Sequence, residues 1–286
     1  MSFFKNPIAA QEKDGVYEPS SFTRFVGMSN KTKYKKQKQQ QNEKYTGSKP
    51  ILVVCTDESL LEMENKLKFS TGNHPVEMFV PMLHFQDAGF DFEFATLTGA
   101  DVKLEMWAYP VNDEHVKRIH DEMREKMDNP KKLSDIISLD DYSALFIPGG
   151  HGCLINLPKS ADLGRILHMA HQQEFPTVTL CHGPGALLAS CAEGTDKEFA
   201  YNGYKIMCFT DKTDKMTPSI GYLPGHMPWL VQKTLEKKGM TILNKTENGA
   251  VTQDRELITG DSPTAAEPLG VFAAPILVKW ANKNKA

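Results

Sequence analysis

The sequence predicts an α/β protein in which helices cover both faces of a mainly parallel β-sheet. From Pro50 onward, short apolar segments alternate with segments of helical periodicity. The apolar segments contain few polar residues, which is typical of parallel strands buried on both faces. The alternation and the buried strands together indicate an α/β sandwich.

The individual elements follow this alternation to the C-terminus. Strands are predicted at residues 50–58, 90–97, 142–150, 177–183, 204–210 and 240–244, and as a pair within 249–263. Helices are predicted at residues 74–89, 161–173, 184–192, 228–239 and 262–283. Pro75 in the first turn and Gly89 after the last turn mark the ends of the first helix.

Two regions depart from the alternation. Residues 1–48 include a basic, glutamine-rich stretch without apolar periodicity, which predicts an N-terminal arm or linker. Residues 49–286 then form the α/β domain. Within this domain, the segment at about 105–140 is longer and more polar than a crossover between strands needs. We expect this inserted segment to form a small accessory cap domain, to which the arm can contribute.

Composition limits the classes of function. The chain has 286 residues, of which 40% are hydrophobic, and its formal net charge of −3 argues against a general nucleic-acid binder. No apolar stretch approaches the ~20 residues that span a bilayer, and no secretory signal precedes the domain. We therefore expect a cytoplasmic protein without a membrane partner. The five cysteines have no CxxC spacing, so no disulfide framework is expected.

One cysteine lies in an unusual place. In "TLCHGPGALL", residues 179–188, Cys181 and His182 stand where an apolar strand changes to a Gly-Pro-Gly turn and a predicted helix. This turn resembles in geometry the nucleophile elbow of hydrolases, although their G-x-S-x-G pattern is absent. A helix N-terminus favours a thiolate, so we expect a lowered pKa for Cys181. The alternative is a buried small hydrophobic residue, which we expect for Cys55, Cys191 and Cys208.

Two further stretches supply polar groups at the carboxyl ends of strands, where reactive groups gather in parallel sheets. In "FIPGGHG", the N–H groups of Gly149 and Gly150 could hold a developing oxyanion, or the motif could simply be a tight exit from a strand. In "STGNHPVE", Glu77 begins a largely apolar helix. Such a carboxyl would stay protonated and could donate to a thiolate or move protons. Alternatively, it only interacts with the helix dipole.

The partner of His182 is less defined. Neighbouring side chains on a turn point apart, so we expect the imidazole to face a group other than Cys181. A carboxylate from "FTDKTDKMTP" is the natural partner, and both Asp211 and Asp214 qualify by spacing. By itself, this lysine-rich segment is typical of a solvated loop.

These motifs, followed by "GYLPGH" and "TGDSP", extend over essentially the whole chain after the arm and together resemble the ThiJ/PfpI superfamily. The length and the last two motifs are similar to its branch of bacterial heat-shock chaperones, the HchA-type glyoxalase III proteins. The resemblance implies a flavodoxin-like core, similar to class I glutamine amidotransferases, with a small extra domain and assembly as a homodimer. It implies Cys181 as the nucleophile, Glu77 as its acid/base partner, and His182 with Asp214 as the remainder of a triad.

The resemblance also implies an activity. That activity is the glutathione-independent conversion of methylglyoxal to lactate through a cysteine hemithioacetal, without a dissociable cofactor. Glyoxal is a related substrate, and deglycation of proteins and nucleotides is a further activity of the branch. Two alternatives remain: a holdase chaperone that binds unfolded proteins through apolar surface, and a cysteine amidase or peptidase.

Members of this branch can also hold a metal through a histidine, an acidic residue and a second histidine. The corresponding positions in this sequence are Gln86, Asp91 and Val111. One carboxylate without imidazoles cannot make a strong zinc site, so we expect no metal there.

Overall fold

A computed structural model gives the fold of residues 8–9, 15–26, 32, 34–35, 43–195 and 197–284. The strands of its main sheet are β3 (Ile51–Val54), β6 (Phe92–Thr96), β7 (Lys131–Lys132), β8 (Ala144–Ile147), β9 (Thr177–Leu180), β12 (Val251–Asp254) and β13 (Leu257–Gly260). The helices around this sheet are α2 (Pro75–Asp87), α3 (Glu114–Asp128), α4 (Ala161–Gln172), α6 (Val231–Lys237), α7 (Ala266–Lys283) and the 3-10 helix η6 (Gly183–Cys191).

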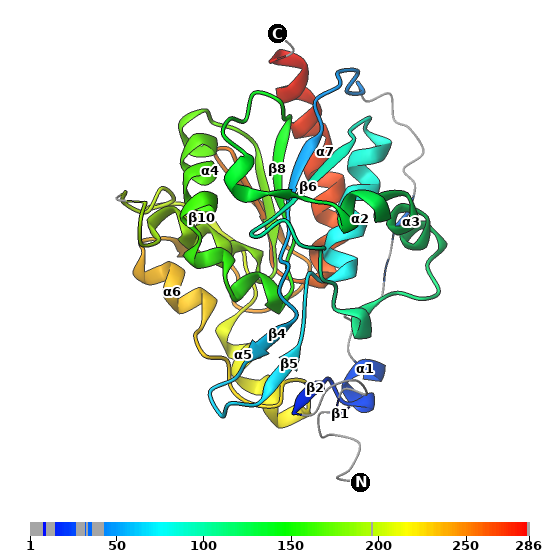
Figure 1. Cartoon of the computed structure of the whole chain (residues 1–286), viewed down its shortest axis with the longest axis vertical. Coiled ribbons are helices and arrows are strands. Elements are labelled where there is room, and N and C mark those ends of the chain that lie inside the picture. The colour runs from blue at the N-terminus through cyan, green and yellow to red at the C-terminus, as the bar shows by residue number, and fades with distance from the viewer. Residues whose placement is uncertain are drawn as a thin grey trace.

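The main sheet has the strand order β12-β13-β9-β8-β3-β6-β7. All neighbouring strands are parallel except β12 and β13, which form an antiparallel pair at one edge. Helices α2 and α7 pack against each other on one side, and α4 packs with η6 on the other (Figure 1). This architecture confirms the predicted α/β class with a mainly parallel sheet.

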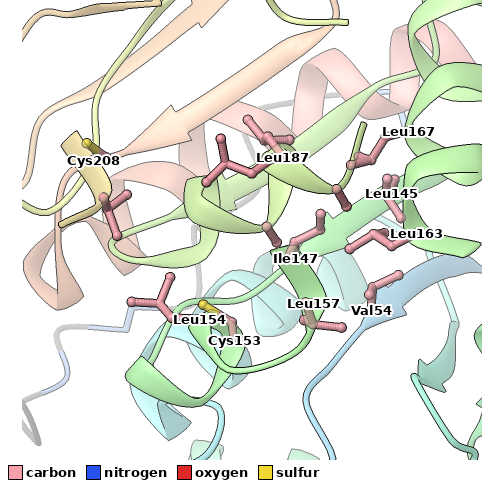
Figure 2. Packing of buried hydrophobic residues seen from close by; sticks show 14 of the residues in the cluster. Val54, Leu145, Ile147, Cys153, Leu154, Leu157, Leu163, Leu167, Leu187 and Cys208 are labelled. Atoms are coloured by element: carbon pink, nitrogen blue, oxygen red, sulfur yellow. The ribbon is translucent and has the colours of Figure 1, made fainter. Parts of the chain in front are cut away.

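The two faces of the sheet carry separate hydrophobic cores, because successive side chains of a strand point to opposite faces. In β3, Ile51 and Val53 pack in the core with α2 and α7, whereas Leu52 and Val54 belong to the core with α4 and η6. Figure 2 shows part of the second core, in which Val54 lies among leucine side chains of α4 and β8. Burial on both faces explains why these strands are apolar throughout.

Cysteines 55, 153 and 208 are fully buried, and Figure 2 shows Cys153 and Cys208 among the residues of the second core. Burial raises the pKa of the thiols of Cys55 and Cys208. The expectation that Cys55 and Cys208 are buried hydrophobic residues is confirmed, and Cys191 is half-buried in η6.

One predicted strand is much shorter than expected. Within residues 204–210 only β10 (Lys205–Ile206) is a strand, and it pairs with β11 (Thr241–Ile242) apart from the main sheet. The backbone N–H groups of Met207 and Cys208 donate to side chains, namely Thr259 Oγ1 and Asn244 Oδ1, instead of to a neighbouring strand. These side-chain bonds end the ladder after two residues.

A second, smaller sheet lies beyond the carboxyl ends of the central strands (Figure 1). Its strands are β1 (Ile8–Ala9), β2 (Val16–Glu18), β4 (Leu60–Glu62) and β5 (Lys68–Ser70), in the order β1-β2-β5-β4. Helix α1 (Ser21–Val26), helix α5 (Asp211–Met216) and the 3-10 helix η7 (Thr217–Ile220) lie on the same side of the molecule. Part of the N-terminal arm thus joins this accessory unit.

The segment at 105–140 does not form the cap, which corrects the expectation from the sequence. Helix α3 packs against α2 of the main domain, and β7 extends the main sheet beside β6. The reason is an apolar stripe on one face of α3, formed by the buried residues Val116, Ile119, Met123 and Met127. Among the described helices, none is both long and apolar enough to span a membrane.

Candidate active site

Cys181 directly follows β9 and has a strained backbone. Its φ angle is +57°, a left-handed conformation that costs about 1–2 kcal/mol for a residue with a Cβ. The neighbouring segments fix this conformation, since the Cys181 N–H donates to Gly260 O and its carbonyl accepts from Phe209 N. The expected sharp turn between strand and helix is therefore present, and the helix that follows is the 3-10 helix η6.

The His182 side chain lies against Cys181, contrary to the expectation that the two side chains point apart. His182 Nδ1 is 3.3 Å from Cys181 Sγ, and its Nε2 lies 3.1 Å from Asp214 Oδ2. The left-handed turn at Cys181 brings the two neighbouring side chains to one side. Burial and the nearby His151 lower the pKa of His182, so the ring is neutral. The tautomer that donates from Nε2 to Asp214 leaves Nδ1 free to accept the thiol proton.

The two candidate carboxylates in α5 have different hydrogen-bond partners. Asp214 is buried and accepts from His182. Asp211 instead accepts from the backbone N–H groups of Gln232 and Lys233 at the start of α6. Geometry thus places Asp214, and not Asp211, in line with His182 and Cys181. The segment expected as a solvated loop is a short helix with two buried carboxyl groups.

Glu77 lies in the first turn of α2 and is fully buried. Neither carboxyl oxygen has a hydrogen-bond partner among the described residues. Burial raises the pKa of Glu77 well above its usual range, which favours the neutral carboxyl. A Cβ added to Gly149 would stand 1.9 Å from Glu77 Oε2 and 2.9 Å from Cys181 Cβ, so both side chains border the same glycine.

The thiol of Cys181 differs from the expectation of an acidic cysteine. It is 3% exposed, and burial together with the adjacent Glu77 raises its pKa. The carboxylate of Asp214 raises the pKa of Cys181 further, and the short 3-10 helix after the cysteine does not compensate for the lost hydration. In the free protein, we therefore describe Cys181 and Glu77 as a coupled pair that holds two protons.

The diglycine after β8 borders this pair. Gly149 O accepts from His74 N, and Gly150 has a φ angle of +104°, which favours glycine. Within the described ranges, neither the Gly149 N–H nor the Gly150 N–H donates a hydrogen bond. Both donors are therefore not used within the described residues, and their role as an oxyanion site stays a prediction.

A model of the DJ-1/PfpI family matches residues 67–196 of the chain. The protein/nucleic acid deglycase HchA of Pseudomonas aeruginosa strain UCBPP-PA14 is 46% identical to it over 241 residues, which are 82% of this chain and 83% of that protein. The chain belongs to the DJ-1/PfpI family. The protein/nucleic acid deglycase HchA of Escherichia coli O7:K1 is 44% identical over 234 residues, with 80% and 81% of the two chains covered.

Among solved structures, glyoxalase III from Candida albicans is similar to this DJ-1/PfpI protein with a TM-score of 0.62 and 25% sequence identity. The match covers 80% of this chain and 98% of that chain.

The metal positions of the family branch do not form a ligand set in this chain. Gln86 donates to Glu122 and accepts from Arg118, and Asp91 forms an ion pair with Lys126 at 2.8 Å. Val111 is an exposed apolar side chain. Cationic side chains thus already bind the polar groups, and the residues present do not fit a metal ion. The absence of a metal at this place stays a prediction.

Two site residues of this DJ-1/PfpI protein were not assigned a role from the sequence. His151, in the motif "FIPGGHG", has its Nε2 atom 3.7 Å from Asp214 Oδ1 and its Nδ1 atom 3.7 Å from Glu105 Oε1. Burial alone would lower the pKa of His151, but the two carboxylates raise it to about 9. The imidazolium ring lies 4.1 Å from the His182 ring, centroid to centroid. Its charge therefore helps to keep His182 neutral.

Glu105 gives no signal in the sequence, because its contacts come from distant segments. It is buried, and its Oε1 atom accepts from Thr71 Oγ1 and from the backbone N–H of His151. Despite its burial, the interaction with the His151 imidazole keeps the pKa of Glu105 below its usual value. A relay of polar side chains thus runs from Glu105 through His151 and Asp214 to His182.

Aromatic side chains cover this relay. Phe69 of β5 lies 5.6 Å from the His151 ring, and Tyr222 lies 5.9 Å from it. Trp107 contacts both Phe69 and Tyr222 at ring distances of 5.7 Å and 5.4 Å. The second sheet and the segment after η7 therefore shield the charges from water, which strengthens their interactions.

Proposed function

We propose that this protein is a deglycase/glyoxalase-type enzyme that converts methylglyoxal to lactate without glutathione. The observation that carries the proposal is that Cys181, His182 and Asp214 form a hydrogen-bonded series beside a buried, neutral Glu77. The relatives named protein/nucleic acid deglycase and the similar glyoxalase III structure support the same class of chemistry. No step requires a dissociable cofactor.

The first half of the reaction forms a hemithioacetal. The Cys181 thiol transfers its proton to His182 Nδ1 as sulfur attacks the aldehyde carbon of methylglyoxal. Asp214 stabilises the imidazolium that results. Glu77 donates its proton to the aldehyde oxygen, and the N–H groups of Gly149 and Gly150 stabilise that oxygen as charge develops. The thiol thus needs no lowered pKa before substrate binds.

The second half moves a proton between two carbons. The Glu77 carboxylate removes the proton from the former aldehyde carbon, while His182 protonates the ketone oxygen, which gives an enediol. Glu77 then returns the proton to the second carbon, and His182 takes up the hydroxyl proton, which leaves a lactoyl thioester on Cys181. Water hydrolyses the thioester, and the thiol and the Glu77 carboxyl regain their protons.

Burial of Cys181 limits the substrates. Cys181 is 3% exposed and aromatic side chains cover the neighbouring His151, so we infer a small dicarbonyl such as methylglyoxal or glyoxal, or one modified side chain or base that projects from a larger molecule. We therefore include deglycation of proteins and nucleotides in the proposal. The same cover disfavours a cysteine peptidase that must bind an extended chain. Holdase chaperone activity and assembly as a homodimer stay predictions.

The test is a glutathione-free assay of methylglyoxal consumption with identification of the product. Wild-type protein should form lactate, and Cys181→Ala should form none above the uncatalysed rate. A matched control is Cys191→Ala, since Cys191 is a half-buried thiol outside the site. Lactate formation by Cys181→Ala at the wild-type rate would exclude the proposed nucleophile. Consumption of methylglyoxal without lactate would exclude the proton transfer.

A further inference from the structure

Three side chains of the site converge in a way that the proposed reaction does not need. The ligand atoms of His151, His182 and Asp214 all lie within 4.8 Å of one another, and all three residues are buried. In the part of the chain that the structure describes, no other group of three histidine, cysteine or acidic residues converges in this manner. They come from the segments after β8 and β9 and from α5, so the fold itself assembles them.

The spacing of these atoms matches a tetrahedral zinc ion. Zinc bonds of about 2.0–2.1 Å to nitrogen or oxygen place neighbouring ligand atoms roughly 3.3–3.4 Å apart. The observed distances bracket this value: His182 Nε2 lies 3.1 Å from Asp214 Oδ2, and His151 Nε2 lies 3.7 Å from Asp214 Oδ1. Because the ligand atoms of all three residues lie within 4.8 Å of one another, a closer approach would give a site with two histidines, one carboxylate and one open position.

A second observation points to a ligand at this place. His151 is 3% exposed, and its Nε2 atom has no hydrogen-bond partner among the described residues. This unpartnered atom faces Asp214, while the opposite ring nitrogen faces Glu105 at 3.7 Å. A carboxylate behind a histidine is the usual arrangement around metal-binding imidazoles, because it fixes the ring and increases its basicity.

The local charge also favours a divalent cation. Glu105 and Asp214 are two buried carboxylates that face the two ring nitrogens of His151. A divalent ion that replaces the proton on His151 balances both carboxylates, which a monovalent group cannot do. Zinc accepts imidazole and carboxylate ligands in this combination.

We propose that His151, His182 and Asp214 form an inhibitory binding site for zinc or a similar divalent transition-metal ion. When the metal occupies His182 Nε2, the remaining ring proton must lie on Nδ1. That nitrogen then donates toward Cys181 and can no longer accept the thiol proton. The site therefore stops the reaction at the first step, and it is distinct from the positions of Gln86, Asp91 and Val111.

Binding is measured first, without reference to activity. Cys181→Ser removes the thiol as a competing ligand, and titration with Co²⁺ followed by visible absorption should show one tetrahedral site per chain. Adding His151→Asn or His151→Gln should abolish that spectrum, whereas His115→Asn, which removes an exposed histidine, should leave it unchanged. Thermal unfolding confirms that each variant is folded. An unchanged Co²⁺ spectrum in both His151 variants would overturn the proposal.

Two further measurements identify the ligands. X-ray absorption of zinc-loaded wild-type protein should show nitrogen and oxygen neighbours only, and a sulfur neighbour at about 2.3 Å would place the metal on Cys181 instead. Glu105→Gln should weaken zinc binding by about 10- to 100-fold, the usual effect of removing a carboxylate behind a metal-binding histidine. Unchanged zinc affinity in this variant would contradict the role of Glu105.

Inhibition is the last measurement. Zinc should abolish dicarbonyl turnover of the wild-type protein at one equivalent, and a chelator should restore it fully. If the protein binds zinc through these residues but has no dicarbonyl activity, the metal site stands and the proposed function fails. If turnover is normal with one zinc bound at this site, the inhibitory role is wrong.

Discussion

Glu77 offers the sharpest test of the site, because one substitution changes turnover and stability in different ways. Glu77→Gln keeps the size of the side chain and removes its titratable proton. If the carboxyl moves protons between the two carbons, turnover should fall by about 10²- to 10⁴-fold. The stability of the folded protein should respond in a manner that depends on pH.

The magnitude of the stability effect follows from burial. The ordinary pKa of the carboxyl is 4.5, and complete burial raises it well above this value in the folded state. Between pH 4.5 and the folded pKa, the unfolded chain releases a proton that the folded chain keeps, so stability falls as pH rises. Within that interval, each pH unit corresponds to about 1.4 kcal/mol of lost stability. Glu77→Gln does not titrate and escapes this loss.

The assay is denaturant unfolding of wild-type and Glu77→Gln proteins at several pH values from 5 to 7.5. The difference in unfolding free energy should change in favour of the variant by about 1.4 kcal/mol per pH unit. Parallel stability curves would refute the description of Cys181 and Glu77 as a pair with two protons. The same comparison in a Cys181→Ala background shows why the curves are parallel. If the difference in unfolding free energy depends on pH only in that background, Cys181 is a thiolate in the wild-type protein.

Three further predictions concern other parts of the site. Asp214→Asn should reduce turnover by about 10⁴-fold, because His182 then adopts the wrong tautomer. Asp211→Asn should cost only about 1 kcal/mol of stability. Equal turnover in the two variants would contradict the assignment of Asp214 as the partner of His182. Gly149→Ala should destabilise the protein by about 1–3 kcal/mol and impair turnover, because its Cβ would stand 1.9 Å from Glu77 Oε2; a fully active variant would show that Glu77 can move freely. Burial lowers the pKa of His74 to about 4, so wild-type protein should lose about 3 kcal/mol as pH falls from 6.5 through 4; His74→Phe should lack this part of the loss, as measured by unfolding at each pH.

The sequence predicted the parts of the site that depend on local chain geometry. Cys181 could be singled out because a Gly-Pro-Gly turn follows a buried strand, and its φ of +57° is the strain that such a turn produces. Glu77 could be singled out because a carboxyl amid apolar residues in a first helical turn has no local partner. Both signals lie within a few residues of the side chain concerned.

The remaining site residues depend on contacts between distant segments. His151 and Glu105 are 46 positions apart in the chain, and no local pattern indicates that topology brings them together. The choice of Asp214 over Asp211 came from the family resemblance, since both aspartates have suitable spacing. The orientation of His182 was predicted wrongly because the rule that neighbouring side chains diverge does not hold at a left-handed residue.

The accessory unit could not be located for a related reason. Its strands β2, β4 and β5 have three residues each, which is too short for an alternating pattern to stand out. The long segment at 105–140 was assigned to the accessory cap because of its polarity. The polar residues of α3, however, lie on its solvent face, and its apolar residues pack on α2. Polarity of a whole segment therefore says less than the spacing of its apolar residues.

The features that distinguish the site are also those that cost stability. The left-handed Cys181, the neutral buried Glu77 and the unpartnered ring nitrogens of His74 all lie where β8 and β9 end. Each is unfavourable alone, and each persists because the two cores on the faces of the sheet hold the surrounding backbone in place. Strain of this kind is expected where a reaction needs a preorganised, poorly hydrated site. A substitution that relieves it, such as Glu77→Gln at neutral pH, should therefore stabilise the fold and remove the chemistry together.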